Sequence, residues 1–161
     1  MTAPTPSQTV GPFYSIGLAR RPEHELVPPD APGAVELLGT LLDGAGEPIR
    51  DGLVEVWEPI ERRFGRSGTD ERGGFRLTLA KPPAPAGAAP HVEVHVFARG
   101  LLRHQRTRIY FPDEHTANAA DPVLAGLNEA DRATLVASEQ DGGLRFDIRM
   151  QGERQTVFFT T

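Results

Sequence analysis

Cysteine is absent from this sequence of 161 residues. Without it there can be no disulfide scaffold, no thiolate zinc site and no cysteine nucleophile. Long apolar runs are also absent, since no stretch approaches the roughly 18 consecutive apolar residues that a membrane helix requires. The N-terminal residues MTAPTPSQTV carry neither the basic residues nor the apolar run of a secretory signal. We therefore expect a cytoplasmic protein that does not enter a membrane.

Positive charge is in short supply. The chain has 17 Lys and Arg residues against 22 Asp and Glu residues, a formal net charge of −5. This balance argues against a broad phosphate-binding surface, so no nucleic-acid partner is expected. The 17 glycines and 15 prolines are typical of a turn-rich β protein. An apolar fraction of 39% is enough for the core of one domain.

The first 33 residues contain seven of the prolines. Each proline fixes φ and removes a backbone donor, so we expect residues 1–33 to be extended and to form neither a helix nor a central strand. Apolar residues such as Val10, Phe13 and Leu26 would then need a surface to cover. Composition leaves two interpretations open: a loose tail, or an arm that packs on a partner chain.

After Gly33 the sequence takes on the period of two that is typical of β-strands. Only Pro122–Ala133 has helical character, with Asp121 and Asn128 placed to cap two short pieces. The sequence therefore predicts an all-β, antiparallel β-sandwich over residues 34–161, with one or two short helices. The expected strands cover residues 35–42, 53–58, 75–79, 91–98, 106–111, 134–138, 144–150 and 156–159.

One segment, His91-Val-Glu93-Val-His95, suggests metal chemistry. Alternate residues of a strand share a face, and two histidines with a carboxylate are the ligands of many non-haem iron sites. However, a rise of about 3.3 Å per residue puts the backbones of His91 and His95 about 13 Å apart. Both side chains cannot easily reach one ion through bonds of about 2 Å. We favour a polar strand face with hydrogen-bonded histidines.

Arg99 follows the apolar run 94–98 and precedes Gly100, which places a guanidinium at the end of a core strand. A surface charge is one interpretation of this position. The other is a clamp for a carboxylate ligand, because the planar guanidinium fork matches that anion with two parallel hydrogen bonds.

Several segments, considered together, resemble the intradiol ring-cleavage dioxygenases, and most of all the alpha subunits of members that act on protocatechuate. The likeness covers about residues 5–161. Its strongest parts are the N-terminal TPSQTVGPF together with FARG and TRIYF, whereas VEVW and the turn TDERGGF are shared by other prealbumin-like sandwiches. These segments are residues 5–13, 97–100, 107–111, 54–57 and 69–75.

The resemblance implies a prealbumin-like sandwich with an extended N-terminal arm. Enzymes of this family insert both atoms of O2 between the two hydroxyl-bearing carbons of a catechol. Protocatechuate (3,4-dihydroxybenzoate) is thereby opened to 3-carboxy-cis,cis-muconate. The resemblance also implies a non-haem Fe(III) ion held by two tyrosines and two histidines of a homologous beta subunit, with αβ units that assemble into higher oligomers.

On this resemblance, no iron ligand and no catalytic residue falls on the present chain. His91 matches the first histidine of the catalytic subunit's pair, but Glu93 stands in place of the second and His95 is out of register. The two tyrosines of the sequence, Tyr14 and Tyr110, lie outside the loops where phenolate ligands belong. We therefore expect Fe(III) to be bound by the beta partner and not by this chain.

The resemblance assigns this chain a part in binding the substrate instead. Thr9, Gly11, Pro12 and Phe13 of the arm would line the pocket near the iron, with Phe13 at a position where the family often has tyrosine. Arg99 would face the substrate carboxylate. Two other functions stay open: a stand-alone, non-catalytic prealbumin-like binding module, and a self-sufficient metal enzyme that uses the His-Glu-His strand.

Overall fold

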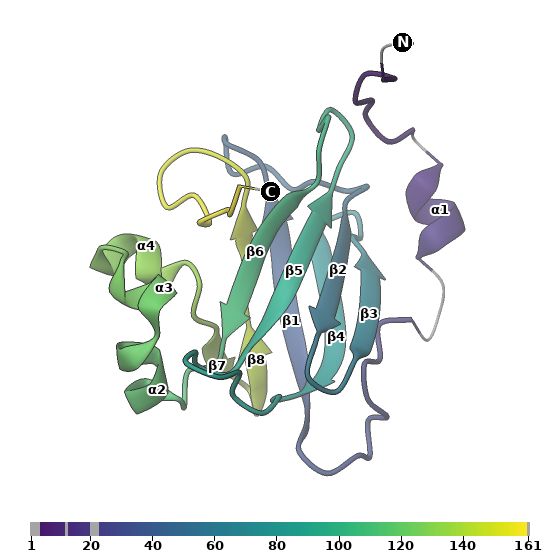
Figure 1. The fold of residues 1–161 in the computed structure, drawn as a ribbon. Coiled ribbons are helices and arrows are strands. Elements are labelled where there is room, and N and C mark those ends of the chain that lie inside the picture. Colours follow the sequence, from purple (N-terminus) through teal and green to yellow (C-terminus); the bar gives the residue numbers. More distant parts are fainter. Residues whose placement is uncertain (1–3, 12, 20–22, 161) are drawn as a thin grey trace.

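The computed structural model describes residues 4–11, 13–19 and 23–160 (Figure 1). Within them the strands are β1 (Ala34–Leu42), β2 (Leu53–Glu58), β3 (Arg63–Gly68), β4 (Gly74–Ala80), β5 (His91–Phe97), β6 (Gln105–Tyr110), β7 (Ser138–Gln140), β8 (Gly143–Arg145) and β9 (Ile148–Arg149). The helices are α1 (Tyr14–Leu18), α2 (His115–Ala120), α3 (Pro122–Ala125) and α4 (Glu129–Ala133). No helix within these ranges combines the length and the apolar character that crossing a membrane requires.

Two sheets pack face to face and confirm the predicted β-sandwich. One has the order β3-β2-β5-β6, and the other has the order β4-β1-β8-β7, with β9 also paired to β1. Most neighbours are antiparallel, but β8 and β9 run parallel to β1. In Figure 1, α2 to α4 lie beside the β6 edge and α1 lies beyond the β3 edge.

The core lies between the sheets and follows from the period of two in the strands. Every second side chain of β2 and β5 turns inward and is fully buried, as Val54, Val56, Val92, Val94 and Val96 show. The opposing sheet contributes leucines and aromatic rings to the same core, including Leu37, Leu77, Phe75 and Phe146. The intervening polar residues must therefore lie on the outer face of the first sheet.

Strand β3 was not predicted, because RFGRSG lacks an apolar alternation. It nevertheless pairs with β2 along its whole length, from Leu53↔Gly68 to Glu58↔Arg63. Its buried positions are Gly65 and Ser67, and a Cβ atom on Gly65 would lie 2.1 Å from the Cδ1 atom of Leu26. The space that a strand side chain normally fills is thus occupied by a residue distant in the sequence.

Three predicted strands differ in the structure. Residues 134–137 form only an isolated bridge, through Val136 to Tyr110, and Ser138 begins β7. Residues 156–159 form only an isolated bridge from Phe159 to Arg106. Residues 144–150 divide into β8 and β9. Between these strands the Asp147 carboxylate accepts the backbone N–H of Thr40 at 2.8 Å, which takes the place of a ladder bond.

The predicted helical segment does hold two helices, α3 and α4. Asp121 and Asn128 cap them as expected, since each side chain accepts backbone N–H groups of the first turn. Helix α2 was not predicted. The expectation that residues 1–33 contain no helix is wrong at α1, which fits into the proline-free stretch 13–21.

The second half of the arm packs on its own sandwich. Leu26 N–H donates to the Thr78 carbonyl at 2.8 Å, and Thr78 N–H donates to the His24 carbonyl at 2.8 Å. Val27 is buried. Residues 4–11, by contrast, are mostly exposed. Packing of this first half on a partner stays a prediction.

We predict that Asp121→Ala destabilises the protein far more than loss of a helix cap does. The buried carboxylate accepts the N–H groups of Val123, Leu124 and Ala89 and the hydroxyl of Tyr110. Its removal leaves buried donors without an acceptor, for a loss of about 3 kcal/mol or more in the free energy of unfolding.

The matched control is Asn128→Ala, which removes the exposed cap of α4 and costs about 1 kcal/mol. Denaturant unfolding of both variants measures the difference. Equal losses would show that the buried contacts of Asp121 add nothing to its role as a cap.

Candidate functional site

The first candidate site lies where the arm meets the end of β5. Phe97 ends this strand, and the chain turns through Ala98, Arg99 and Gly100, the last with a φ of +87°. A positive φ favours glycine, which explains the residue type at this turn. The N–H of Gly100 donates to the Thr9 hydroxyl oxygen at 2.8 Å. Thr9 is thereby held beside Arg99, although 90 positions separate them in the sequence.

Tyr14, the first residue of α1, makes a second attachment at the same place. Its hydroxyl lies within hydrogen-bond reach of the backbone carbonyls of Asp51 and Phe97, the latter at 3.0 Å. Burial and the charge of Asp51 raise the pKa of Tyr14 to about 12, against the opposing effect of Arg99. The hydroxyl therefore keeps its proton at neutral pH and acts as a donor.

Arg99 forms an ion pair between its Nε atom and the carboxylate of Asp51. The Arg99 side chain remains 58% exposed, whereas that of Asp51 is 29% exposed. Both residues border an open cavity of about 700 Å³, whose other lining residues are Pro48, Ile49, Arg50, Glu71 and Gly100. A guanidinium thus faces a space of the size that small organic ligands occupy.

None of the described arm residues assigned to substrate binding lines this cavity. Phe13 is 76% exposed, and a Cβ atom on Gly11 would meet nothing within 4 Å. Pro12 lies outside the described residues. The structure therefore brings Thr9 close to Arg99 in space, whereas Gly11 and Phe13 are uncovered by other parts of the chain.

Sequence reasoning did not single out Asp51, and it considered Tyr14 only as an iron ligand. Both residues contact partners that are distant in the sequence, so no local sequence pattern predicts these contacts. The nearest signal is the acidic residue before Gly52 at the start of a strand, a common turn sequence that specifies no partner.

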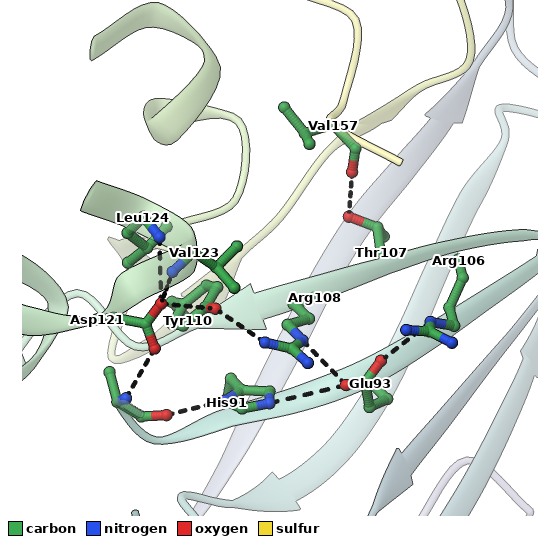
Figure 2. A network of polar contacts seen from close by, with 11 residues as sticks. His91, Glu93, Arg106, Thr107, Arg108, Tyr110, Asp121, Val123, Leu124 and Val157 are labelled. Atoms are coloured by element: carbon green, nitrogen blue, oxygen red, sulfur yellow. Dashed lines mark hydrogen bonds and ion pairs between the residues drawn. The ribbon is translucent and has the colours of Figure 1, made fainter. Parts of the chain in front are cut away.

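The second candidate site is the outer face of β5, where His91, Glu93 and His95 were predicted to point together. Figure 2 shows Glu93 between two guanidinium groups of β6, with its carboxylate 2.9 Å from Arg108 Nε and 3.5 Å from Arg106 Nε. His91 Nε2 lies 3.7 Å from the same carboxylate. His95 stacks near His104 instead, at 5.0 Å between ring centroids.

The predicted hydrogen-bonded polar face is confirmed at His91, whose Nδ1 lies 2.8 Å from the Ala89 carbonyl oxygen. The contacts continue beyond Glu93 (Figure 2). Arg108 Nη1 donates to the Tyr110 hydroxyl at 3.4 Å, and that hydroxyl donates to Asp121 at 3.2 Å. We call the set His91, Glu93, Arg106, Arg108, Tyr110 and Asp121 the β5–β6 network. It connects both strands to helix α3.

The charges of the network determine which of its groups ionise. Burial opposes ionisation of Glu93, but His91 and the charges of Arg108 and Arg106 outweigh it and hold the pKa of this carboxyl below its usual value. Burial also raises the pKa of Tyr110, so its phenol stays protonated.

These donors do not fit Fe(III). Tyr14 and Tyr110 lie in different sites, where their hydroxyls are hydrogen-bonded to the Phe97 carbonyl and to Asp121. The Glu93 carboxylate is already paired with Arg106 and Arg108. Across residues 4–11, 13–19 and 23–160, no three or more His, Cys, Asp or Glu side chains are grouped so that they could hold a metal ion. The contacts that the polar face of β5 does make connect β5 to β6 and to helix α3.

Comparison with known proteins places these features in context. The chain is 41% identical to a protocatechuate 3,4-dioxygenase alpha chain of Pseudomonas putida, over 96% of this chain and 95% of the relative. It is 39% identical to an alpha chain of the same name from Burkholderia cepacia, over 96% of both. A protocatechuate 3,4-dioxygenase beta chain from B. cepacia is 30% identical over 76% of this chain and 66% of the relative.

Solved structures agree with the fold. An intradiol ring-cleavage dioxygenase from Tetranychus urticae superposes with a TM-score of 0.63 at 15% identity, over 93% of this chain and 94% of the other. The dioxygenase domain of a carbohydrate-binding fusion from Streptomyces sp. SirexAA-E gives 0.60 at 24% identity, over 93% and 99%. No family model matches the chain.

The lowered pKa of Glu93 predicts how Glu93→Gln depends on pH. Because the folded carboxyl has a lower pKa than the unfolded one, its contribution to stability is complete above the ordinary value of 4.5 and disappears as the pH falls through the folded value. The gap in the free energy of unfolding between the wild type and Glu93→Gln should therefore be largest at neutral pH and shrink in acid.

Denaturant unfolding from neutral pH down into acid measures this difference in the free energy of unfolding. Glu36→Gln, on the exposed side of β1, is the control for the loss of one negative charge. A gap that stays constant or widens below pH 4.5 would contradict the assignment.

Proposed function

The chain belongs to the family of protocatechuate 3,4-dioxygenase alpha chains, and on that premise we propose that it completes the substrate pocket of a two-chain intradiol dioxygenase. In this proposal a homologous beta chain holds the Fe(III). The complex inserts both atoms of O2 into protocatechuate, between its two hydroxyl-bearing carbons, and yields 3-carboxy-cis,cis-muconate. Identity to alpha chains over nearly the whole length supports the role, and the likeness to a beta chain supports a homologous partner.

The observation that carries the proposal is the exposed Arg99 guanidinium beside the attached arm. Protocatechuate is anionic at its ring carboxylate, and a guanidinium binds a carboxylate through charge-assisted, bidentate hydrogen bonds. Such a hydrogen bond contributes about 1.5–3 kcal/mol. Thr9 lies next to this group through its bond with Gly100. Arg99 thus favours a carboxylated catechol over a neutral one.

Gly11, Pro12 and Phe13 complete the proposed pocket from the arm. Gly11 has no side chain and open space around it, which allows a flat ring to approach the backbone closely. Phe13 is a large apolar side chain that this chain leaves uncovered. An aromatic residue in that state is suited to pack against a second chain or a substrate ring.

Iron is assigned to the partner because the donors of this chain do not fit Fe(III), as described above. No catalytic step is therefore assigned to a residue of this chain. We also propose that αβ units associate into higher oligomers and that the complex resides in the cytoplasm. Analytical ultracentrifugation and cell fractionation test these two points.

We predict that Arg99→Ala in the αβ complex raises KM for protocatechuate by about ten- to a hundredfold, the equivalent of one charge-assisted hydrogen bond. Turnover of a catechol that lacks the carboxylate should change much less. Steady-state kinetics on both substrates measure the effect. Arg50→Ala is the matched control, since Arg50 lines the same cavity but pairs with Glu71. Equal losses on both substrates would refute the carboxylate clamp.

We also predict that the purified chain alone contains no stoichiometric iron, whereas the chain co-expressed with its beta partner forms an iron-containing, red-brown complex. Metal analysis and visible absorption measure both preparations. Stoichiometric iron in the isolated chain, lost in Glu93→Ala, would instead support a self-sufficient metal enzyme. Failure to co-purify with the beta chain would favour a stand-alone binding module.

A further inference from the structure

Asp51 occupies the point where three separate segments meet. Its carboxylate pairs with Arg99 from the turn after β5, and its backbone carbonyl accepts the hydroxyl of Tyr14 from the arm. Asp51 itself precedes β2. One residue therefore holds both the proposed carboxylate clamp and the segment that carries the other pocket residues.

The position of Asp51 is fixed by the sandwich rather than by Arg99. The adjacent Gly52 donates its N–H to the Thr69 hydroxyl at 2.8 Å and accepts the Thr69 N–H at 3.0 Å. The Thr69 hydroxyl in turn donates to the Ile49 carbonyl at 2.7 Å. A Cβ atom on Gly52 would lie 2.4 Å from Leu41 Cδ2, so this backbone sits directly on the core. Asp51 is thus an anchored carboxylate.

Arg99 is the adjustable member of the pair. More of its side chain is exposed than of Asp51, 58% against 29%. Asp51 engages the Nε atom, and within the described residues no hydrogen bond occupies either Nη atom of Arg99. The Nη edge of a guanidinium suffices for a bidentate bond to a carboxylate. The ion pair therefore orients the side chain while leaving the ligand-binding edge free.

We propose that Asp51 is a positioning residue for Arg99 and thereby sets the preference of the enzyme for a catechol that bears a ring carboxylate. This inference rests on the proposed function of Arg99. A fixed orientation spares the long arginine side chain the loss of rotamer freedom on binding, which otherwise weakens the interaction. The competing effect is repulsion between Asp51 and the substrate carboxylate, which would make Asp51 unfavourable for binding. The two effects change KM in opposite directions.

The test is Asp51→Asn in the αβ complex, because this change removes the charge and retains the backbone carbonyl that Tyr14 contacts. We expect KM for protocatechuate to rise about tenfold while kcat changes less than about twofold, corresponding to a ground-state contact of about 1.4 kcal/mol. A catechol without the carboxylate should show no comparable change in KM. Asp51→Glu should recover part of the lost affinity.

The matched control is Glu71→Gln, which removes the same charge from the same cavity without touching Arg99. Glu71 is 89% exposed and pairs at 3.5 Å with Arg50, so its loss should not raise KM for protocatechuate. An equal effect of Glu71→Gln and Asp51→Asn would show that general charge in the cavity, and not positioning, determines KM.

The remaining outcomes separate the inference from its premise. If Arg99→Ala raises KM but Asp51→Asn lowers it or leaves it unchanged, the positioning role is wrong and the clamp stands. If Arg99→Ala also has no effect, the proposed function itself fails. Thermal unfolding of each variant checks that the protein is folded. Asp51→Ser is a second neutral substitution at the same position and should raise KM as Asp51→Asn does. An equal rise in KM for both substrates would indicate a structural role and overturn the inference.

Discussion

The alternation of side chains along β5 is the constraint on which both candidate sites depend. Val92, Val94 and Val96 are fully buried between the sheets, and each contributes about 1.5–3 kcal/mol of apolar burial. A shift of one residue would expose all three, so the register of the strand is strongly specified. The same register places Glu93 on the outer face and ends the strand where Arg99 reaches the cavity. Core packing therefore positions groups that take no part in the core.

Two of the arginine–carboxylate pairs of this protein illustrate opposite uses of such an ion pair. In the β5–β6 network, Glu93 lies between Arg106 and Arg108, half-buried, and these contacts connect strands to each other and onward to α3 (Figure 2). Such a pair mainly offsets the cost of taking its own charges out of water. Arg99, by contrast, remains largely in solvent beside the anchored Asp51. An exposed guanidinium keeps its capacity to bind a further anion.

The sequence predicted the parts of the fold whose cause is local. Periodicity identified β1, β2, β4, β5 and β6, and capping residues identified α3 and α4. It failed where the cause is distant: Gly65 belongs to a strand because Leu26 fills the adjacent space, and Val136 of the predicted strand makes only an isolated bridge to Tyr110. The same holds for the candidate site. Arg99 was singled out by its position at the end of a core strand and then by a family resemblance. Its pairing with Asp51, 48 positions away, has no signature in a single sequence.

The first half of the arm is attached to its own chain at Thr9 and at Tyr14, two points that flank Gly11 and Phe13. Thr9 is bound through Gly100 and Tyr14 through Asp51 and Phe97, and Gly11 and Phe13 lie between these attachments. These two hydrogen-bonded anchors leave the Phe13 side chain 76% exposed. Ordering a segment costs conformational entropy that exposed residues do not recover. In the proposed αβ complex, a second surface that closes over Phe13 would supply the compensating burial.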